Sequence, residues 1–197
     1  MTPTTPDPQA DTQDTARPPG RPRAGVTALV FAATLRTVDE LGYARATVDR
    51  IAVAAGVAKT TIYRRWPSKG ALIVDCLLDS FGPLPLESTD RAELMASAIH
   101  WIAAKIGQPG VGDSFAGVFS DAVSDPVLRE IVSARFQDPY RLALQKALDE
   151  PESRVLFYID VVVGTLLHRM GMTGKPMADA DVAALVEMVL PHLADDA

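Results

Sequence analysis

Apolar residues recur along most of the chain at intervals of three and four, which is the spacing of amphipathic helices. The sharpest stripe, in 178–193, follows i, i+3, i+4, i+7, i+8 and i+11 and consists of Val182, Leu185, Val186, Val189, Leu190 and Leu193. The segment 152–172 is instead apolar nearly all round, so we expect other helices to cover most of its sides. The pattern predicts an all-α protein.

Glycine and proline divide this pattern into about nine helices. Gly42 ends the first helix, and the Gly-Pro-Leu-Pro-Leu segment at 82–86 marks the main boundary, because two prolines within three residues break a helix. Asp125 and Pro126 fit the start of a later helix that can bend at Pro139. The predicted helices are 24–41, two short ones within 47–66, 68–81, 90–107, 113–123, 125–149, 152–172 and 178–193.

The same breaks define three parts of the chain. Residues 1–16 are rich in Pro, Thr, Asp and Gln with almost no large apolar side chain, so we predict a disordered tail. Residues 17–81 hold a basic arm and the first four helices, and residues 84–197 hold the other five.

Two short helices joined by a glycine turn stand out in 47–66. Thr47 can cap the first helix, and Gly56 supplies the positive φ that ends it. The second helix turns Ile62 inward, with Trp66 just beyond, and carries on its other side Lys59, Thr60, Thr61, Tyr63 and Arg64. This is a helix-turn-helix arrangement, in which the second helix enters the major groove of DNA.

Basic residues flank this motif on both sides. Arg21 and Arg23 belong to a Pro/Gly arm at 17–23 that can lie in a minor groove, like an AT-hook, or can add only non-specific attraction. Ser68 is the expected cap of the fourth helix, whose free N–H groups and Lys69 would together suit a phosphate.

The formal net charge of −6 conceals a strong asymmetry. Residues 17–75 hold ten Lys and Arg against four Asp and Glu, whereas residues 76–197 hold nine against eighteen. Positive charge is therefore concentrated around the helix-turn-helix, where the neutralisation of phosphates requires it.

Composition argues against several other classes of protein. The single cysteine, Cys76, rules out an internal disulfide, and its apolar neighbours favour a buried thiol over a redox sensor. His100, His168 and His192 are too scattered to suggest a metal set, and no catalytic motif or phosphate loop occurs, so we expect no cofactor and no enzyme. Without a signal peptide or a run of about 20 apolar residues, the protein is expected to be soluble and cytoplasmic.

The segment 23–81 also carries a resemblance to a known family. The residues that carry it, in order, are Thr47, Ile51-Ala52, Ala55-Gly56-Val57, Thr61-Ile62-Tyr63, Trp66, Ser68-Lys69 and Leu72. With them the chain resembles the TetR family of bacterial transcriptional regulators, and the match extends over its whole helical architecture. It departs from the family pattern at Ala58, where Ser or Thr often stands, and at Gly70, where an acid is frequent.

The resemblance implies roles on double-stranded DNA. Base edges or nearby phosphates would be reached by Lys59, Thr60, Thr61 and Arg64. The phosphate backbone would be held by Thr47, Tyr63 and Lys69.

We also expect a homodimer on a palindromic operator, because one recognition helix has too small a footprint for tight specific binding. In TetR-like proteins the last two helices form a four-helix bundle with the partner. The expected interface residues are Val161, Val162, Leu167, Val186, Val189, Leu190 and Leu193. The alternative is that these stripes face the core of their own subunit.

The resemblance finally implies an effector pocket among the middle helices, with the candidate residues Trp101, Phe115, Phe119, Phe136 and Tyr158. Each of them could instead be plain core, and an apolar pocket would suit a largely apolar small molecule. The reading that unites these features is a repressor released from its operator by an effector. An activator of the same fold, or a helical enzyme with an accessory DNA-binding domain, is the alternative.

Overall fold

A computed structural model describes residues 23–191, which form helices and no strand. The all-α prediction is therefore confirmed over this range. The predicted disordered tail at 1–16, the arm residue Arg21, the side chain of Arg23 and the interface candidate Leu193 lie outside the described residues.

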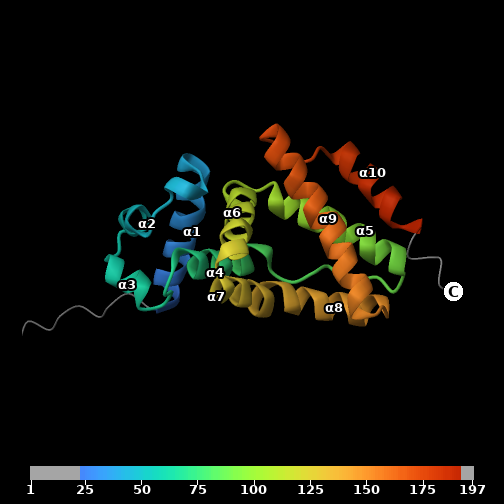
Figure 1. Cartoon of the computed structure of the whole chain (residues 1–197), viewed down its shortest axis with the longest axis horizontal. Helices are drawn as coiled ribbons and strands as arrows, with labels where there is room; N and C mark the ends of the chain where they lie inside the picture. The colour runs from blue at the N-terminus through green and yellow to red at the C-terminus, as the bar shows by residue number, and fades with distance from the viewer. Residues whose placement is uncertain (1–22, 192–197) are drawn as a thin grey trace, which may run out of the picture.

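The first helices surround a small core of their own (Figure 1). They are α1 (Arg23–Leu41), a 3₁₀ turn η1 (Tyr43–Arg45), α2 (Val48–Ala55), α3 (Lys59–Tyr63) and α4 (Lys69–Phe81). Ile51, Ile62 and Leu72 are each at most 1% exposed in this core. Trp66 is 5% exposed and its ring packs 5.6 Å from that of Phe31, so Trp66 is a core residue.

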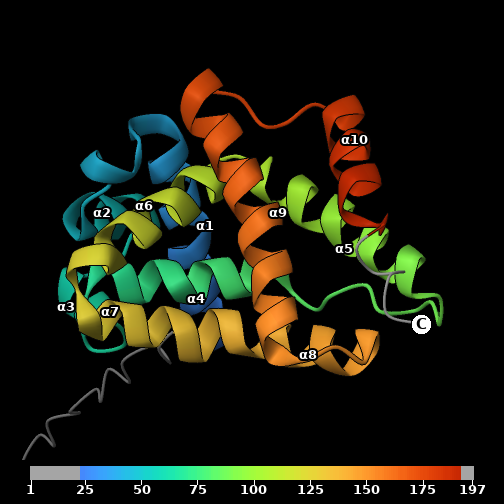
Figure 2. The ribbon, with the colours of Figure 1, turned by 45° about the vertical axis from the view of Figure 1, so that its right-hand side comes forward.

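The remaining helices enclose a second, larger core (Figure 2). They are α5 (Arg91–Ile106), α6 (Val111–Ser124), α7 (Pro126–Ile131), the turn η2 (Val132–Gln137), α8 (Asp138–Leu148), α9 (Glu152–Thr173) and α10 (Asp179–Val189). Because α7, η2 and α8 follow one another without a break, they form one rod, and the described residues contain nine helices as predicted. In Figure 2, α9 crosses this rod, and α10 packs against α5.

The rod contains one turn of π-helix, which the sequence pattern did not predict. Pro139 has no N–H, so the carbonyl of Arg135 cannot receive the usual bond from the residue four positions later. The N–H of Asp138 instead donates to the carbonyl of Ser133, five residues back. The expected site of a bend is thus a widened turn just before Pro139.

The turn before α6 makes a close contact between the two cores. Gly110 has φ +72°, and a Cβ atom at this position would lie 2.1 Å from the carbonyl oxygen of Leu35 in α1. Glycine therefore lets the α5–α6 turn rest directly on the α1 backbone. Gly174, which ends α9, has a similar φ of +68° but no atom within 4 Å of such a Cβ.

We predict that Gly110→Ala destabilises the protein more than Gly174→Ala. The left-handed conformation alone costs about 1–2 kcal/mol in either variant, which corresponds to a few degrees of thermal midpoint. Only at Gly110 must a backbone segment also move. The thermal midpoint of Gly110→Ala, measured by circular dichroism, should therefore fall at least about twice as far as that of Gly174→Ala. Equal losses in the two variants would show that the contact with Leu35 adds nothing.

Candidate DNA-binding surface and ligand cavity

The helix-turn-helix has the caps that the sequence predicts. The Thr47 hydroxyl accepts from the N–H of Arg50 at 3.4 Å, and Gly56 ends α2 with φ +64°. At Ala58 no side-chain cap is present, as its identity requires, but the N–H of Thr61 still donates to the Ala58 carbonyl at 2.8 Å. The short recognition helix is therefore held mainly by tertiary packing of Ile62 and Trp66.

The outer side of α3 presents the predicted set of DNA-contacting side chains to solvent. Lys59, Thr60, Tyr63 and Arg64 are exposed, and Thr61 is half-buried beside them. Thr47, at the start of α2, is exposed as well. The predicted contacts within 47–66 are therefore all at least partly accessible to solvent.

Lys59 is not an isolated cation. Its ammonium lies 2.8 Å from a carboxylate oxygen of Asp49 in α2 and 5.6 Å from the centroid of the Tyr63 ring. The hydrogen bond with Asp49 raises the pKa of Lys59, so the ammonium stays charged. Because the pair is exposed, Lys59 can exchange this partner for a phosphate or a base at little cost.

Lys69 occupies a different environment from the one predicted. Its ammonium lies 3.6 Å from the centroid of the Tyr43 ring and donates to the Tyr43 carbonyl at 3.1 Å. Burial lowers the pKa of Lys69, against the attraction of Asp121. The side chain is therefore turned into the junction between the two cores and away from the α3 surface, which does not fit the expected phosphate clamp.

Tyr43 is the centre of this junction. Its hydroxyl donates to a carboxylate oxygen of Asp121 in α6, and a Cβ atom at Gly117 would lie 2.1 Å from its ring. Burial, together with the bond to Asp121, raises the pKa of Tyr43, so the phenol remains a donor. The junction thus fastens the α1–α2 connection to α6.

Two further arginines lie beside the predicted surface. Arg45 and Arg50 are exposed next to Thr47, where the Arg50 guanidinium donates to the Arg45 carbonyl at 2.9 Å. Neither arginine is among the predicted contacts, although their position on either side of a helix cap was a usable signal. They add positive charge where a phosphate backbone would approach.

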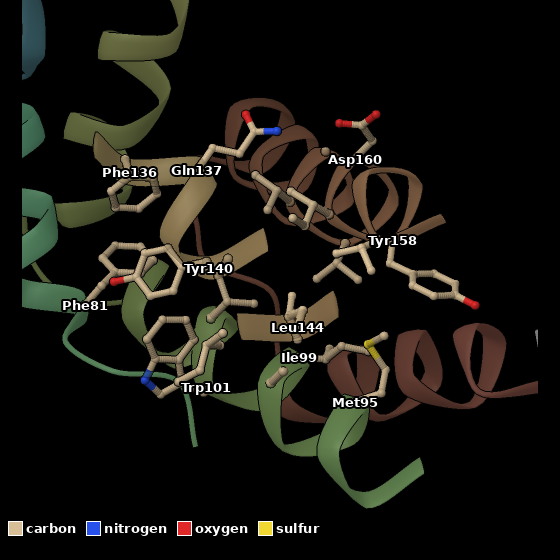
Figure 3. A pocket seen from close by; sticks show the side chains of 18 of the residues that line it. Phe81, Met95, Ile99, Trp101, Phe136, Gln137, Tyr140, Leu144, Tyr158 and Asp160 are labelled. Carbon is tan, nitrogen blue, oxygen red and sulfur yellow. The ribbon is translucent and has the colours of Figure 1, made fainter. Parts of the chain in front are cut away.

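The larger core encloses a cavity of about 290 Å³ (Figure 3). All five predicted pocket residues line it: Trp101, Phe115, Phe119, Phe136 and Tyr158. Phe81, at the end of α4, joins them, with ring centroids 5.1 Å from Phe136 and 5.5 Å from Trp101. Phe81 was predicted only as the end of the fourth helix, so its place in the cavity lining is a finding of the structure.

Few polar groups reach this cavity. The hydroxyl of Tyr140 donates to the Gly82 carbonyl at 2.8 Å, and Tyr158 is bonded to Arg154 at 3.1 Å, so neither phenol is unpaired. Gln137 and Asp160 lie at one edge, as Figure 3 shows. The lining suits an uncharged molecule with an apolar body.

The outer face of α9 is exposed and mainly uncharged, with the acid Asp160 at its border. Phe157 is 63% and Met172 72% exposed, and Gly164 and His168 lie between them at helical spacing. By length and composition α9 could cross a membrane, the one such helix among the described residues, and 22% of its most apolar stretch is buried. An apolar face of this length marks an interaction surface.

The expected dimer interface needs correction in its residues. Val162, Val186 and Val189 are 5%, 8% and 4% exposed within their own subunit, so they cannot offer a surface to a partner. For these three the expectation is wrong, because their stripes face the subunit core. Val161, Leu167 and Leu190 are half-buried and pack against the same core.

The chemistry of the other candidate groups is inert. Cys76 is buried, and burial raises the pKa of its thiol, which is the opposite of an activated cysteine. Among the described residues, no three His, Cys, Asp or Glu side chains come together in a group that could hold a metal.

Comparisons with known proteins agree with this geometry. The family described as "Bacterial regulatory proteins, tetR family" matches residues 30–76. An HTH-type transcriptional regulator of Mycobacterium tuberculosis (strain ATCC 25618 / H37Rv) is 32% identical over 179 residues, which is 83% of this chain and 86% of the relative. The DNA-binding transcriptional repressor TetR of Mycobacteroides abscessus is 28% identical over 175 residues, covering 83% and 91% of the two chains.

Solved structures share the fold. A TetR-family transcriptional regulator from Mesorhizobium loti gives a TM-score of 0.66 at 13% identity, covering 88% of this chain and 97% of that chain. The fatty acid degradation regulator FadR from Bacillus halodurans gives 0.62 at 18%, covering 88% and 96%. Together, the identity to the M. tuberculosis regulator over most of both chains and the match across the helix-turn-helix show that this chain belongs to the TetR family of helix-turn-helix transcriptional regulators.

Proposed function

We propose that this regulator is a dimeric repressor that leaves a palindromic operator when an uncharged, largely apolar small molecule occupies its cavity. The observation that carries the proposal is the position of α4, which begins directly after the recognition helix and ends with Phe81 in the cavity lining. A single helix thus links the DNA surface to the ligand site. A repressor rather than an activator is supported by the relative that is named a repressor.

On DNA, each subunit places α3 in the major groove. Thr47, Tyr63 and Arg64 hold phosphates, and Lys59, Thr60 and Thr61 reach base edges or nearby phosphates. This set is supported by its shared exposure and by the positive charge of 17–75. The arm residues Arg21 and Arg23 would add a minor-groove contact.

The dimer brings two recognition helices to neighbouring half-sites. The exposed α9 face from Phe157 to Met172 supports this pairing, because a second copy can cover it across a two-fold axis. Val161 and Leu167 would border that contact, together with Leu190 at the end of α10. The remaining candidate, Leu193, lies outside the described residues. The assembled regulator acts in the cytoplasm, where the chromosome lies.

An electrophoretic mobility shift with the DNA that flanks its own gene tests the proposal. We expect a salt-sensitive complex with a palindrome within this DNA. This palindrome should outcompete random DNA for the protein. Binding that is equal on random DNA would contradict it.

Variants of two cationic side chains distinguish a residue that contacts DNA from one that packs in the junction around Tyr43. Arg64→Ala should lower the slope of log affinity against log salt by about 1 per subunit, because one phosphate contact is lost. Lys69→Ala should leave the slope unchanged and lower the thermal midpoint, because its ammonium contacts Tyr43. A slope reduced equally by Lys69→Ala would restore its role as a phosphate clamp.

The cavity can be tested by filling it. Ala98 is 7% exposed and lines the cavity, whereas Ala104 on the same helix faces solvent. Ala98→Phe should weaken binding of the uncharged fluorophore N-phenylnaphthylamine by about tenfold or more, because the ring takes up its space. Ala104→Phe is the matched control. Unchanged fluorescence titrations in both variants would show that this probe binds elsewhere.

The dimer surface can be tested with a charge. Phe157→Asp should raise the dimer dissociation constant by about thirtyfold or more in sedimentation equilibrium, as expected for a buried aromatic at an interface. Val123 is 76% exposed near the end of α6 and outside the α9 face, so Val123→Asp is the control. A Phe157→Asp dimer as tight as that of the control would place the interface on another face.

A further inference from the structure

The π-helical turn η2 contacts both the cavity and the DNA-binding core. The side chains of Phe136 and Gln137 line the cavity. Arg135, the preceding residue, points to the other side, where its guanidinium lies 2.6 Å from a carboxylate oxygen of Asp75 in α4. Three consecutive residues thus join the ligand site to α4.

Asp75 also contacts Trp66, which follows the recognition helix. Its second carboxylate oxygen accepts from the indole N–H of Trp66 at 2.8 Å, while the buried oxygen faces the guanidinium of Arg135. The carboxylate therefore holds an arginine from η2 and a tryptophan from the helix-turn-helix at the same time.

Trp66 fixes the end of α3. Its backbone N–H donates to the Ile62 carbonyl at 2.9 Å, and its ring packs on Phe31 of α1. Because the recognition helix is so short, the position of Trp66 sets the direction in which Tyr63 and Arg64 project. Trp66 itself does not line the cavity.

We propose that Arg135 and Asp75 are positioning residues that couple occupancy of the cavity to the orientation of the recognition helix. This inference rests on the proposed function of the cavity. In a close-packed core, a ligand that displaces Phe136 must move the turn that also carries Arg135. A π-helical turn can make such a movement, since its wider hydrogen bonding rearranges within one turn.

The second contact between the cores, around Tyr43, does not provide this coupling. It joins α6 to the connection between α1 and α2, and none of its bonds reaches α3. The path through Arg135 and Asp75 is distinct, because it ends on Trp66, whose backbone N–H bonds to Ile62 in the recognition helix.

Fluorine NMR of the full chain labelled with fluorotryptophan tests the coupling, because the two tryptophans report its two ends. Trp101 lines the cavity and Trp66 lies just after α3, and Trp101→Phe assigns the two resonances. N-phenylnaphthylamine serves as the cavity probe. In the wild type we expect saturating probe to shift both resonances.

Arg135→Met should reduce the response of Trp66 to the probe and leave the response of Trp101 intact. The probe affinity and the Trp101 shift should stay within about twofold of wild type, while the probe-induced Trp66 shift should fall about fivefold or more. Arg129→Met is the matched control, since Arg129 lies in α7 of the same rod but donates only to the carbonyls of Ala122 and Val123. This control should retain both shifts.

Asp75→Asn provides a second test if Arg135→Met fails to fold. It keeps an acceptor for the Trp66 indole but loses the ion pair, so it too should lose the Trp66 response. Two results would overturn the coupling alone. One is a wild-type Trp66 resonance that does not shift when the probe binds, and the other is a Trp66 shift in both ion-pair variants that is as large as in the wild type. A Trp101 resonance that never shifts overturns the cavity as a ligand site, and the coupling with it.

Discussion

The burial of α4 from two sides is the constraint on which the rest of the structure depends. Ala71, Leu72 and Cys76 belong to the small core around the helix-turn-helix, and Ile73, Leu77 and Phe81 belong to the larger core around the cavity. The helix cannot shift in one core without disturbing packing in the other. Gly70 serves the same constraint, since a Cβ atom there would lie 2.7 Å from the Leu128 side chain of α7.

This arrangement gives the regulator two kinds of contact with different tasks. The outer side chains of α3 are exposed, and their ion pairs, such as Lys59 with Asp49, are weak, so these side chains can change partners. The contacts between the cores are partly buried and geometrically specific, as at Tyr43 and Asp75, so they can carry a change of shape from one core to the other.

Local signals predicted most of the fold and the caps of the helix-turn-helix. The caps at Thr47 and Ser68, the glycine turn at Gly56 and the helical stripes depend on residues close in sequence. Three features depended instead on distant partners: the inward turn of Lys69, the role of Phe81 and the burial of Val162. Periodicity shows that a helix has an apolar face, but it cannot show whether that face meets its own core or a second copy.

Hydroxyl-radical footprinting of the DNA that flanks the gene tests the central claim most directly. Two copies that each insert one α3 predict two protected patches on one face of the duplex, related by a dyad and centred about 10 base pairs, or a multiple of that spacing, apart. Saturating effector should remove both patches together. A single patch, or protection without dyad symmetry, would contradict a dimeric regulator that reads DNA through α3.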